Sequence, residues 1–178
     1  MRKELLDILH RDAFIKKQVV LASGKVSNYY VDVRRVSLNS RGIYLIANLM
    51  WPLVKEANVT AVGGLTMGAD PIVTGICMVA AQNGVNLKGF LVRKEAKGHG
   101  QKQLIEGPQL SEGERVIVVD DVATSASSII KAIEAAREAK LNVVKAMCVL
   151  DRGEGATENL TKLNCSLVSL YKKEDMPV

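Results

Sequence analysis

Short apolar runs alternate along this chain with longer segments in which apolar residues recur at helical spacing. The runs that predict strands are residues 59–62, 87–92, 116–119, 142–150 and 165–171. Helical spacing occurs in residues 2–10, 40–56, 72–83 and 129–136. Ser40 is expected to cap the second of these helices, and Pro52 to kink or end it. Strands that alternate with helices in this way predict an α/β fold with a doubly wound, mainly parallel sheet.

Residues 21–35 (LASGKVSNYYVDVRR) break this pattern with a Ser-Gly turn signal and an alternation that predicts extended chain. Two interpretations remain open. The segment is either an antiparallel hairpin arm or a lid that covers a flat anionic ring of a ligand. The residues of the lid would be Ser23, Gly24, Lys25, Tyr29 and Tyr30. With the helix of residues 2–10, this segment is expected to form a small N-terminal hood over the carboxyl edge of the sheet. The hood would span about residues 1–36, and about residues 37–178 would form the core of the same single domain.

The most informative stretch is VIVVDDVATSASS, residues 116–128. Four β-branched residues predict a strand that is buried on both faces and stops at Asp120 and Asp121. Small hydroxyl residues then open a helix, where unpaired backbone N–H groups and the helix dipole favour a phosphate. Carboxylates beside a phosphate would repel the ligand unless they face sugar hydroxyls or a divalent cation. A ribose 5-phosphate satisfies both halves, although an isolated Asp-Asp pair is more often a solvated strand end before an N-capped helix.

Two other segments would meet this one at the same edge of the sheet. GGLTMGADP (residues 63–71) places glycines between a strand and a helix, so backbone amides could approach a diphosphate, although such a turn is more often only a turn. RKEAKGHGQKQLIEGP (residues 93–108) concentrates basic side chains: Arg93, Lys94, Lys97, His99 and Lys102. A charged segment is a solvated loop by default, but its place after a strand also suits a lid of cations.

The composition narrows the function classes. With 178 residues, 48% of them hydrophobic, the chain is long enough for one core and one domain. The net charge of +5 suits an anionic small molecule and is too small to indicate nucleic acid, and 4% aromatic residues disfavour a base-stacking surface. Cys77, Cys148 and Cys165 stand singly in apolar runs, as expected for reduced core residues of a cytoplasmic protein. There is no membrane-span pattern, Walker A loop or G-x-G-x-x-G fingerprint.

Residues 116–128 resemble the phosphoribosyl-diphosphate signature of the type I phosphoribosyltransferases: an apolar strand, two acids, two variable positions and a Thr/Ser/Gly-rich turn. Nearly the whole chain is similar to the orotate phosphoribosyltransferase family, because SGKVSNYYVD, RKEAKGHG and LDRGEG resemble its hood, flexible loop and orotate-side strand end. The resemblance implies transfer of the phosphoribosyl group of 5-phosphoribosyl 1-diphosphate to orotate, giving orotidine 5′-monophosphate and diphosphate in pyrimidine biosynthesis. It also implies a homodimer whose lid reaches the neighbouring site, and Mg²⁺ that is carried by the substrate near the two acids.

The resemblance gives each matching residue a role. The residues implied to act in catalysis on the diphosphate are Arg93, Lys94, Lys97 and His99. The residues implied to bind the rest of phosphoribosyl diphosphate are Asp120, Asp121, Val122, Ala123, Thr124, Ser125, Ala126, Ser127 and Ser128. The residues implied to face orotate are Lys25, Tyr29, Tyr30, Thr124 and Arg152. Without the resemblance, the expected role of Arg152 is a surface ion pair with Asp151 or Glu154.

The sequence departs from the family pattern in three places. Ala22 precedes the hood Ser-Gly where some relatives have Lys, Met67 and Gly68 occupy a turn where some have Lys, and Ala126 stands where Gly is common. We expect adjusted affinity rather than a lost site, because the N–H of Ala126 can still donate. Two rival functions are a phosphoribosyltransferase for another base and a regulator of this fold that binds nucleic acid. The lid cations disfavour the regulator, which could dispense with them.

Overall fold

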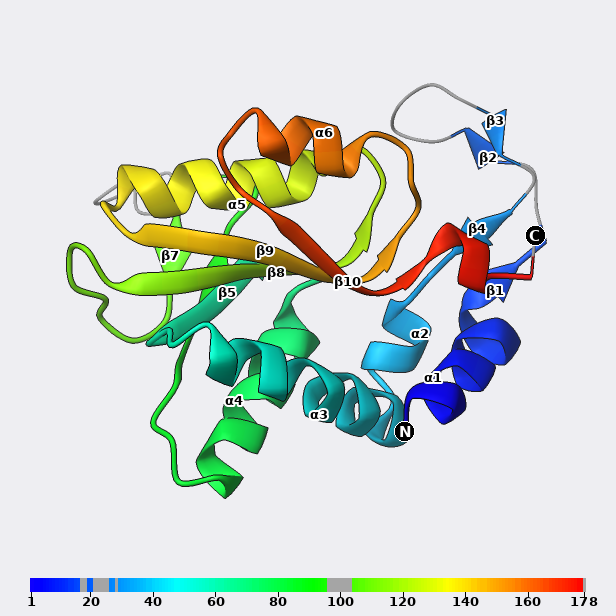
Figure 1. The fold of residues 1–178 in the computed structure, drawn as a ribbon, viewed down its shortest axis with the longest axis horizontal. Coiled ribbons are helices and arrows are strands. Elements are labelled where there is room, and N and C mark those ends of the chain that lie inside the picture. Colours follow the sequence, from blue (N-terminus) through cyan, green and yellow to red (C-terminus); the bar gives the residue numbers. More distant parts are fainter. Residues whose placement is uncertain (17–18, 21–25, 28, 96–103, 178) are drawn as a thin grey trace.

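One sheet forms the centre of the structure, a computed structural model that describes residues 1–16, 19–20, 26–27, 29–95 and 104–177 (Figure 1). Its six strands, in spatial order, are β10 (Leu167–Lys172), β9 (Asn142–Asp151), β8 (Arg115–Ala123), β5 (Ala61–Leu65), β6 (Lys88–Val92) and β7 (Ile105–Glu106). Neighbouring strands are parallel, except that the short β7 pairs antiparallel with β6. The predicted doubly wound, mainly parallel sheet is confirmed.

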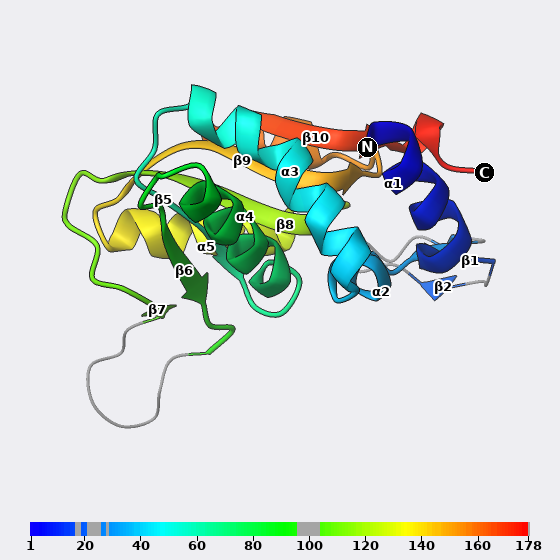
Figure 2. The same cartoon turned by 90° about the horizontal axis from the view of Figure 1, so that it is seen from below.

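Helices cover both faces of this sheet (Figures 1 and 2). On one face lie α3 (Ser40–Glu56) and α4 (Asp70–Gln82), and on the other lie α5 (Ser127–Glu138) and α6 (Ala156–Thr161). In β8, Ile117 and Val119 join the core that contains α3 and α4, whereas Val116 and Val118 join the core that contains α5. Because successive side chains of a strand point to opposite faces, the unbroken apolar run of β8 fills two cores.

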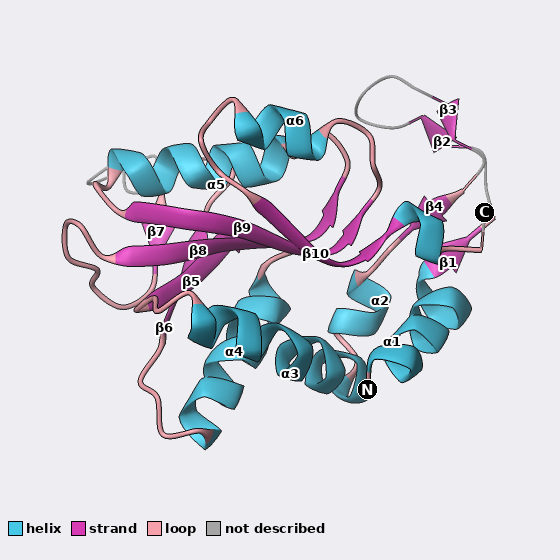
Figure 3. Ribbon diagram, viewed as in Figure 1, coloured by secondary structure: helices cyan, strands magenta, loops and turns pink. Residues whose placement is uncertain are grey.

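The N-terminal segment lies at the edge of the sheet where β8 and β9 end (Figure 3). Its elements are α1 (Arg2–Ile8), a short π-helical turn η1 (Leu9–Ala13), β1 (Phe14–Ile15), β2 (Val19–Val20), β3 (Val26–Ser27), β4 (Tyr30–Val31) and α2 (Arg34–Ser37). β1 pairs with β4 and β2 with β3, both antiparallel. Leu5, Leu9 and Val36 are buried in the same core as α3, which fixes the segment against the sheet.

The two ends of the chain meet in this region. The Tyr171 hydroxyl donates to the backbone oxygen of Arg2 at 2.6 Å, and His10 Nε2 lies 2.7 Å from the backbone oxygen of Asp175 in the last turn, η2 (Lys173–Asp175). His10 therefore forms a contact between the two ends of the chain.

Three predicted details were wrong. Extended chain does not continue to Arg35, because β4 ends at Val31 and Val33 and Val36 reach the core from the turns of α2. Asn39, not Ser40, caps α3, since its side chain accepts from the N–H groups of Arg41 at 3.0 Å and Gly42 at 3.4 Å.

The third wrong detail is the early end of α3 at Pro52, because the helix continues to Glu56; the alternative, a kink, stays a prediction. Trp51 and Val54 are buried on either side of Pro52, so tertiary packing holds the last turn in spite of the hydrogen bond that proline removes. β7 and α6 were not predicted, because elements of two and six residues are too short to show a period.

Two further expectations concern the core and the membrane. All three cysteines are free; Cys148 and Cys165 are buried and Cys77 is partly buried, in agreement with the prediction of reduced core residues. In the part of the chain that the structure describes, no helix is long and apolar enough to cross a membrane.

Candidate active site

Two strand-to-helix junctions meet where the winding of the sheet reverses. From β5 the chain proceeds to β6 on one side, whereas from β8 it proceeds to β9 and β10 on the other, and β5 and β8 are neighbours. Open α/β sheets bind ligands at such a point, beyond the carboxyl ends of the strands. We call residues 63–70 the β5–α4 junction and residues 120–128 the β8–α5 junction.

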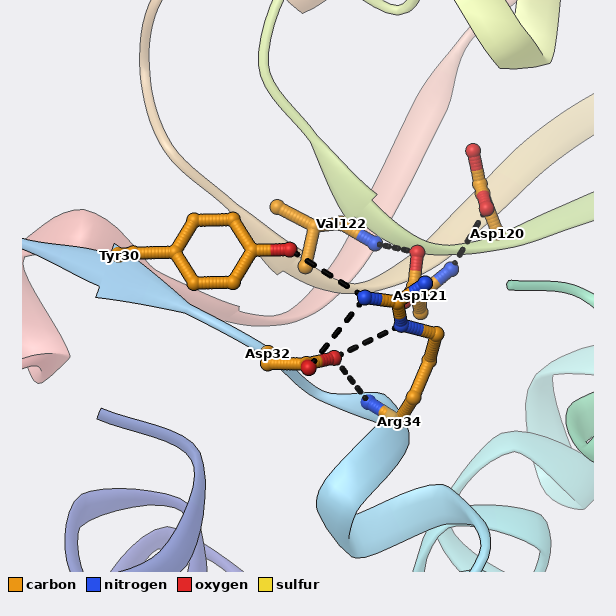
Figure 4. Close-up of polar contacts among 6 residues, drawn as sticks. All are labelled: Tyr30, Asp32, Arg34, Asp120, Asp121 and Val122. Carbon is orange, nitrogen blue, oxygen red and sulfur yellow. Dashed lines mark hydrogen bonds and ion pairs between the residues drawn. The ribbon is translucent and has the colours of Figure 1, made fainter. Parts of the chain in front are cut away.

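Asp120 and Asp121 begin the β8–α5 junction (Figure 4). The prediction that this strand stops at the two acids was wrong. β8 continues to Ala123, because β9 pairs with it as far as Asp151. Asp120 Oδ1 accepts from the N–H of Asp121 at 2.9 Å, and Asp121 Oδ1 accepts from the N–H of Val122 at 2.8 Å. Each carboxyl group is thus fixed by the backbone of the next residue and keeps acceptor capacity for a ligand.

The environment of the two acids disfavours two adjacent negative charges. Burial raises the pKa of Asp120 well above its usual range, and the charge of Asp121 adds to the rise. Burial also raises the pKa of Asp121, while the N–H of Val122 and the positive charge of Arg34 act in the opposite direction. Ligand groups that donate hydrogen bonds or carry positive charge would therefore stabilise the ionised acids.

The second half of this junction presents backbone N–H groups. Ala126 precedes α5 with φ 63° and ψ 21°, in the left-handed region, and no side chain caps the helix. The first N–H groups of α5 consequently have no side-chain partner at the helix start, where the dipole favours an anion. Around them lie the hydroxyl residues Thr124, Ser125, Ser127 and Ser128, and Asn159 of α6 supports the turn by donating to the Ser125 carbonyl at 3.1 Å.

The β5–α4 junction is shaped by glycines that leave room for other groups. A Cβ at Gly64 would lie 2.1 Å from the Val119 carbonyl oxygen of β8. A Cβ at Gly68 would lie 2.6 Å from Asp121 Oδ1 and 2.8 Å from Asp120 Oδ1. The two junctions therefore touch, and a side chain at residue 68 would have to displace the carboxyl groups of the acids.

Arg152 follows β9 and is only 3% exposed. Its N–H donates to the Ala123 carbonyl at 2.9 Å, which places it beside the β8–α5 junction. The guanidinium lies over the ring of Tyr29, 4.7 Å from its centroid, and Nε donates to Glu154 Oε1 at 3.0 Å. The expected ion pair with Glu154 exists, but the expected surface location is wrong, because the N-terminal segment covers the side chain.

The predicted tyrosines occupy different positions. Tyr29 stacks on Phe14 with ring centroids 5.3 Å apart, and its ring also contacts the Arg152 guanidinium. Tyr30 pairs with Ile15 in the β1–β4 ladder, and its hydroxyl accepts from Arg34 Nη2 at 3.4 Å. The described part of the segment is antiparallel and lies at the carboxyl edge, so the hairpin interpretation is confirmed. The lid stays a prediction, because Ser23, Gly24 and Lys25 lie outside the described residues.

Arg34 and its partner Asp32 were not predicted to lie at the site. Asp32 Oδ1 accepts from Arg34 Nε at 2.8 Å and Asp32 Oδ2 from Nη2 at 3.3 Å, and the pair lies near Asp121 (Figure 4). Hydrogen bonds from Arg34 lower the pKa of Asp32, in spite of its partial burial. An Asp two residues before an Arg was visible in the sequence, but only the fold brings them to the acids.

The predicted lid is described in part. Arg93 and Lys94 follow β6 at the carboxyl edge of the sheet, and Arg93 Nη1 donates to Glu106 Oε1 of β7 at 3.3 Å. Lys94 is exposed. Lys97, His99 and Lys102 lie outside the described residues, as do Lys25 and Ala22 of the hood.

Asp120 and Asp121 are also candidate metal ligands. Within the described ranges, no group of three or more His, Cys, Asp and Glu side chains could hold a metal ion. Asp120 and Asp121 do supply the hard oxygen atoms that Mg²⁺ prefers, so they fit a cation that brings further oxygens from a ligand.

Comparison with known proteins identifies the family. Residues 38–169 match the family model described as "Phosphoribosyl transferase domain". The "Orotate phosphoribosyltransferase" of Aquifex aeolicus (strain VF5) is 48% identical over 156 residues, which cover 88% of this chain and 85% of that protein. The chain belongs to the orotate phosphoribosyltransferase family. The "Orotate phosphoribosyltransferase" of Corynebacterium glutamicum (strain R) is 43% identical over 175 residues, which cover 98% of this chain and 93% of that protein.

Solved structures agree with this assignment. The crystal structure of Mycobacterium tuberculosis H37Rv orotate phosphoribosyltransferase in complex with 5-phospho-alpha-D-ribosyl 1-diphosphate has a TM-score of 0.82 and 33% identity, and covers 99% of both chains. The type I phosphoribosyltransferase fold is thereby confirmed. The matched family model includes both junctions and Arg152, but it begins after Arg34.

Proposed function

We propose that this protein transfers the phosphoribosyl group of 5-phosphoribosyl 1-diphosphate to orotate, with orotidine 5′-monophosphate and diphosphate as products. The observation that carries the proposal is the contact between the two junctions: an acid pair beside a glycine turn, followed by an uncapped helix start. One edge of the sheet thus offers acceptors for sugar hydroxyls and N–H donors for two phosphate groups.

The sugar and its 5-phosphate are assigned to the β8–α5 junction. Asp120 and Asp121 would accept hydrogen bonds from the two ribose hydroxyls, which relieves the cost of burying the acids. The 5-phosphate would accept from the N–H groups at the start of α5 and from the hydroxyls of its first turn. The contacting residues are Val122, Ala123, Thr124, Ser125, Ala126, Ser127 and Ser128.

The diphosphate is assigned to the space between the β5–α4 junction and the lid. As the bond to diphosphate breaks, the anomeric carbon gains positive character and the leaving group gains negative charge, so cations that contact the leaving group lower the barrier. Arg93, Lys94, Lys97 and His99 are the lid residues proposed for this role. Closure of the lid would also exclude water, which could otherwise hydrolyse the sugar diphosphate.

Mg²⁺ is proposed to arrive on the substrate, with Asp120 and Asp121 as the residues nearest to it. When bound, the ion would neutralise part of the diphosphate charge. The two acids would orient the ribose hydroxyls whether or not they touch the ion directly.

Orotate is assigned to the space between the β8–α5 junction and the N-terminal segment. Glu154 engages Nε of Arg152 and Tyr29 covers one face of its guanidinium, so the group is held in one plane. A fixed planar donor set suits the oxygen-rich edge of orotate better than the mixed edge of adenine. Lys25, Tyr30 and Thr124 are the other proposed contacts of the base.

A homodimer in which each lid reaches the neighbouring site is also proposed. Exposed apolar side chains occur in or next to α3 and α4, at Leu38, Tyr44, Met67 and Met78, which supports an interface that includes these helices. Mixing Lys97→Ala subunits with Asp120→Asn subunits tests the shared lid. If lids act across the interface, mixed dimers contain one intact site and about a quarter of wild-type activity returns; if each lid serves its own subunit, activity does not return.

Diphosphate release, measured with orotate, uracil, adenine, guanine and hypoxanthine, tests the reaction itself. We expect release only with orotate, and with Mg²⁺ present. Release with a purine would instead support the rival transferase, and binding of duplex DNA without any release would support the regulator. The family assignment disfavours both rival functions. We also propose that the protein acts in the cytoplasm, as part of pyrimidine biosynthesis.

For Arg152→Ala we expect a higher KM for orotate and a nearly unchanged KM for phosphoribosyl diphosphate, since only the base loses a partner. Lys162→Ala, an exposed cation on the same side of the sheet as α6, is the control. Equal weakening of both substrates would contradict the base assignment of Arg152.

A further inference from the structure

The β5–α4 junction supplies no positive side chain to the diphosphate that the proposed function places there. Its residues from Thr66 to Asp70 (TMGAD) include an acid and no Lys or Arg, and Gly68 has no room for a side chain. A diphosphate in this place would also face Asp120 and Asp121, whose charges repel it. Backbone N–H groups offset only part of that repulsion, so cations from other elements are needed. The proposed lid residues and Mg²⁺ are some of these, and the N-terminal segment offers another.

Arg34 is a cation that reaches this place from the N-terminal segment. Arg34 is the first residue of α2. Val33, just before it, and Val36, two residues after it, are fully buried, so the backbone that carries Arg34 is fixed in the core. Its guanidinium interacts electrostatically with Asp121, the acid against which Gly68 also lies. Figure 4 shows its guanidinium between Asp32 and Asp121.

The donors of Arg34 are only partly engaged. Asp32 and Tyr30 accept hydrogen bonds from Nε and Nη2, at distances between 2.8 and 3.4 Å. No hydrogen bond from Nη1 occurs among the described residues, and the side chain is 39% exposed. Asp32 therefore fixes one side of the planar group and leaves two N–H donors of the other side for a ligand.

We propose that Arg34 binds the diphosphate of 5-phosphoribosyl 1-diphosphate through Nη1 and supplies the positive charge that the β5–α4 junction lacks. Asp32 is the positioning residue, since it touches Arg34 and not the ligand. The inference rests on the proposed function, because that function places a diphosphate beside the acids.

Calorimetric titration of Arg34→Gln tests the proposal against Arg35→Gln, a control with the same change of charge at the next, exposed residue of α2. The probes are phosphoribosyl diphosphate, inorganic diphosphate and ribose 5-phosphate, each with Mg²⁺. Loss of a charge-assisted contact should weaken the first two ligands about tenfold or more in Arg34→Gln. Ribose 5-phosphate, which has no diphosphate, should stay within about twofold of wild type, as should all three ligands in Arg35→Gln.

A second pair of variants distinguishes a direct contact of Arg34 with the diphosphate from a general effect of its positive charge. Arg34→Lys keeps the charge but loses the planar fork, and Asp32→Asn keeps the arginine but loosens it, so both should weaken diphosphate binding by less than Arg34→Gln does. Equal weakening of ribose 5-phosphate in Arg34→Gln would overturn the proposal in favour of an effect on the acids. Binding equal to that of Arg35→Gln would overturn it as well.

Failure of the proposed function gives a different result. In that case wild-type protein would neither bind phosphoribosyl diphosphate nor release diphosphate with orotate. If wild-type protein does both and Arg34→Gln matches Arg35→Gln, only the role of Arg34 fails.

Discussion

The two junctions at the carboxyl edge of the sheet form a ligand site by opposite means. The β5–α4 junction depends on missing side chains: Gly64 lies against the backbone of β8 and Gly68 against two carboxyl groups. The β8–α5 junction depends on side chains that are present, namely two acids and a series of hydroxyl residues before α5. The first junction therefore tolerates almost no added atom, whereas the second should tolerate changes of size better than changes of charge.

This difference has a physical origin in how each junction meets its neighbours. Gly64 belongs to a central strand and is enclosed by protein, so an added atom has nowhere to go. Most residues between Thr124 and Ser128 are partly exposed and have solvent beside them. Four substitutions, ordered from the largest expected effect to the smallest, test the comparison.

Gly64→Ala should have the largest effect, and mainly on stability. Its Cβ would lie 2.1 Å from the Val119 carbonyl oxygen and 2.6 Å from Ala69 Cβ, so β5 and β8 must separate. We expect a loss of about 3 kcal/mol in the free energy of unfolding, measured by urea denaturation. Gly113→Ala is the control, because it has positive φ but open space and should cost only about 1 kcal/mol. Equal losses would show that packing at Gly64 is not tight.

Gly68→Ala should chiefly affect ligand binding. The new methyl carbon would lie 2.6 Å from Asp121 Oδ1 and 2.8 Å from Asp120 Oδ1 and would displace both carboxyl groups. The cost to folding is smaller because those side chains can move. We expect kcat/KM for phosphoribosyl diphosphate to fall about 100-fold, with a small change in melting temperature. Val85→Ala, at an exposed residue between α4 and β6, should leave both values near wild type. If Gly68→Ala keeps the wild-type kcat/KM, the contact between the two junctions is not needed for ligand binding.

The difference between the junctions also explains which features could be predicted from the sequence. The β8–α5 junction was predictable because its chemistry is carried by side chains in one continuous stretch, VVDDVATSASS, after a strongly apolar strand. The contact between Gly68 and the acids joins residues more than fifty positions apart, and no local pattern encodes it. Arg34 was missed for the same reason. Burial of Arg152 was missed because it depends on Tyr29, which the fold brings from the other end of the chain.

Asp120→Asn should change the pH dependence of stability and weaken ligand binding. Because the pKa of Asp120 is raised in the folded protein, the folded state holds this proton more tightly than the unfolded chain does. The ligand-free protein should therefore lose stability as the pH rises from the unfolded pKa of about 3.9 through the folded pKa. Asn cannot ionise, so that part of the slope should disappear in denaturation curves taken between pH 4 and 8.

The same variant should bind phosphoribosyl diphosphate about tenfold more weakly, since an amide is a poorer acceptor for a ribose hydroxyl than a carboxylate. Asp7→Asn, at an exposed residue of α1, is the control for both measurements. An unchanged slope would mean that Asp120 titrates alike in both states, and unchanged affinity would contradict the ribose assignment.

Ala126→Gly should have the smallest effect, because three contributions nearly cancel. Glycine would relieve the left-handed conformation at φ 63°, a gain of about 1 kcal/mol. It would also remove a buried methyl group, a loss of about 0.8 kcal/mol, and it would add freedom to the unfolded chain, which costs about 0.4 kcal/mol or more. We expect a change within about 0.5 kcal/mol and unaltered affinity for ribose 5-phosphate, because the N–H of residue 126 is retained. Lys140→Gly provides the comparison: φ is 60° and the side chain is exposed, so no buried methyl group is lost. The substitution also removes the ion pair of Lys140 with Glu112, which contributes little because both side chains are exposed, so stability should rise relative to Ala126→Gly. If Ala126→Gly is the more stable of the two, packing of the Ala126 methyl group against the α5 core contributes nothing, and the tolerance of the β8–α5 junction has another cause.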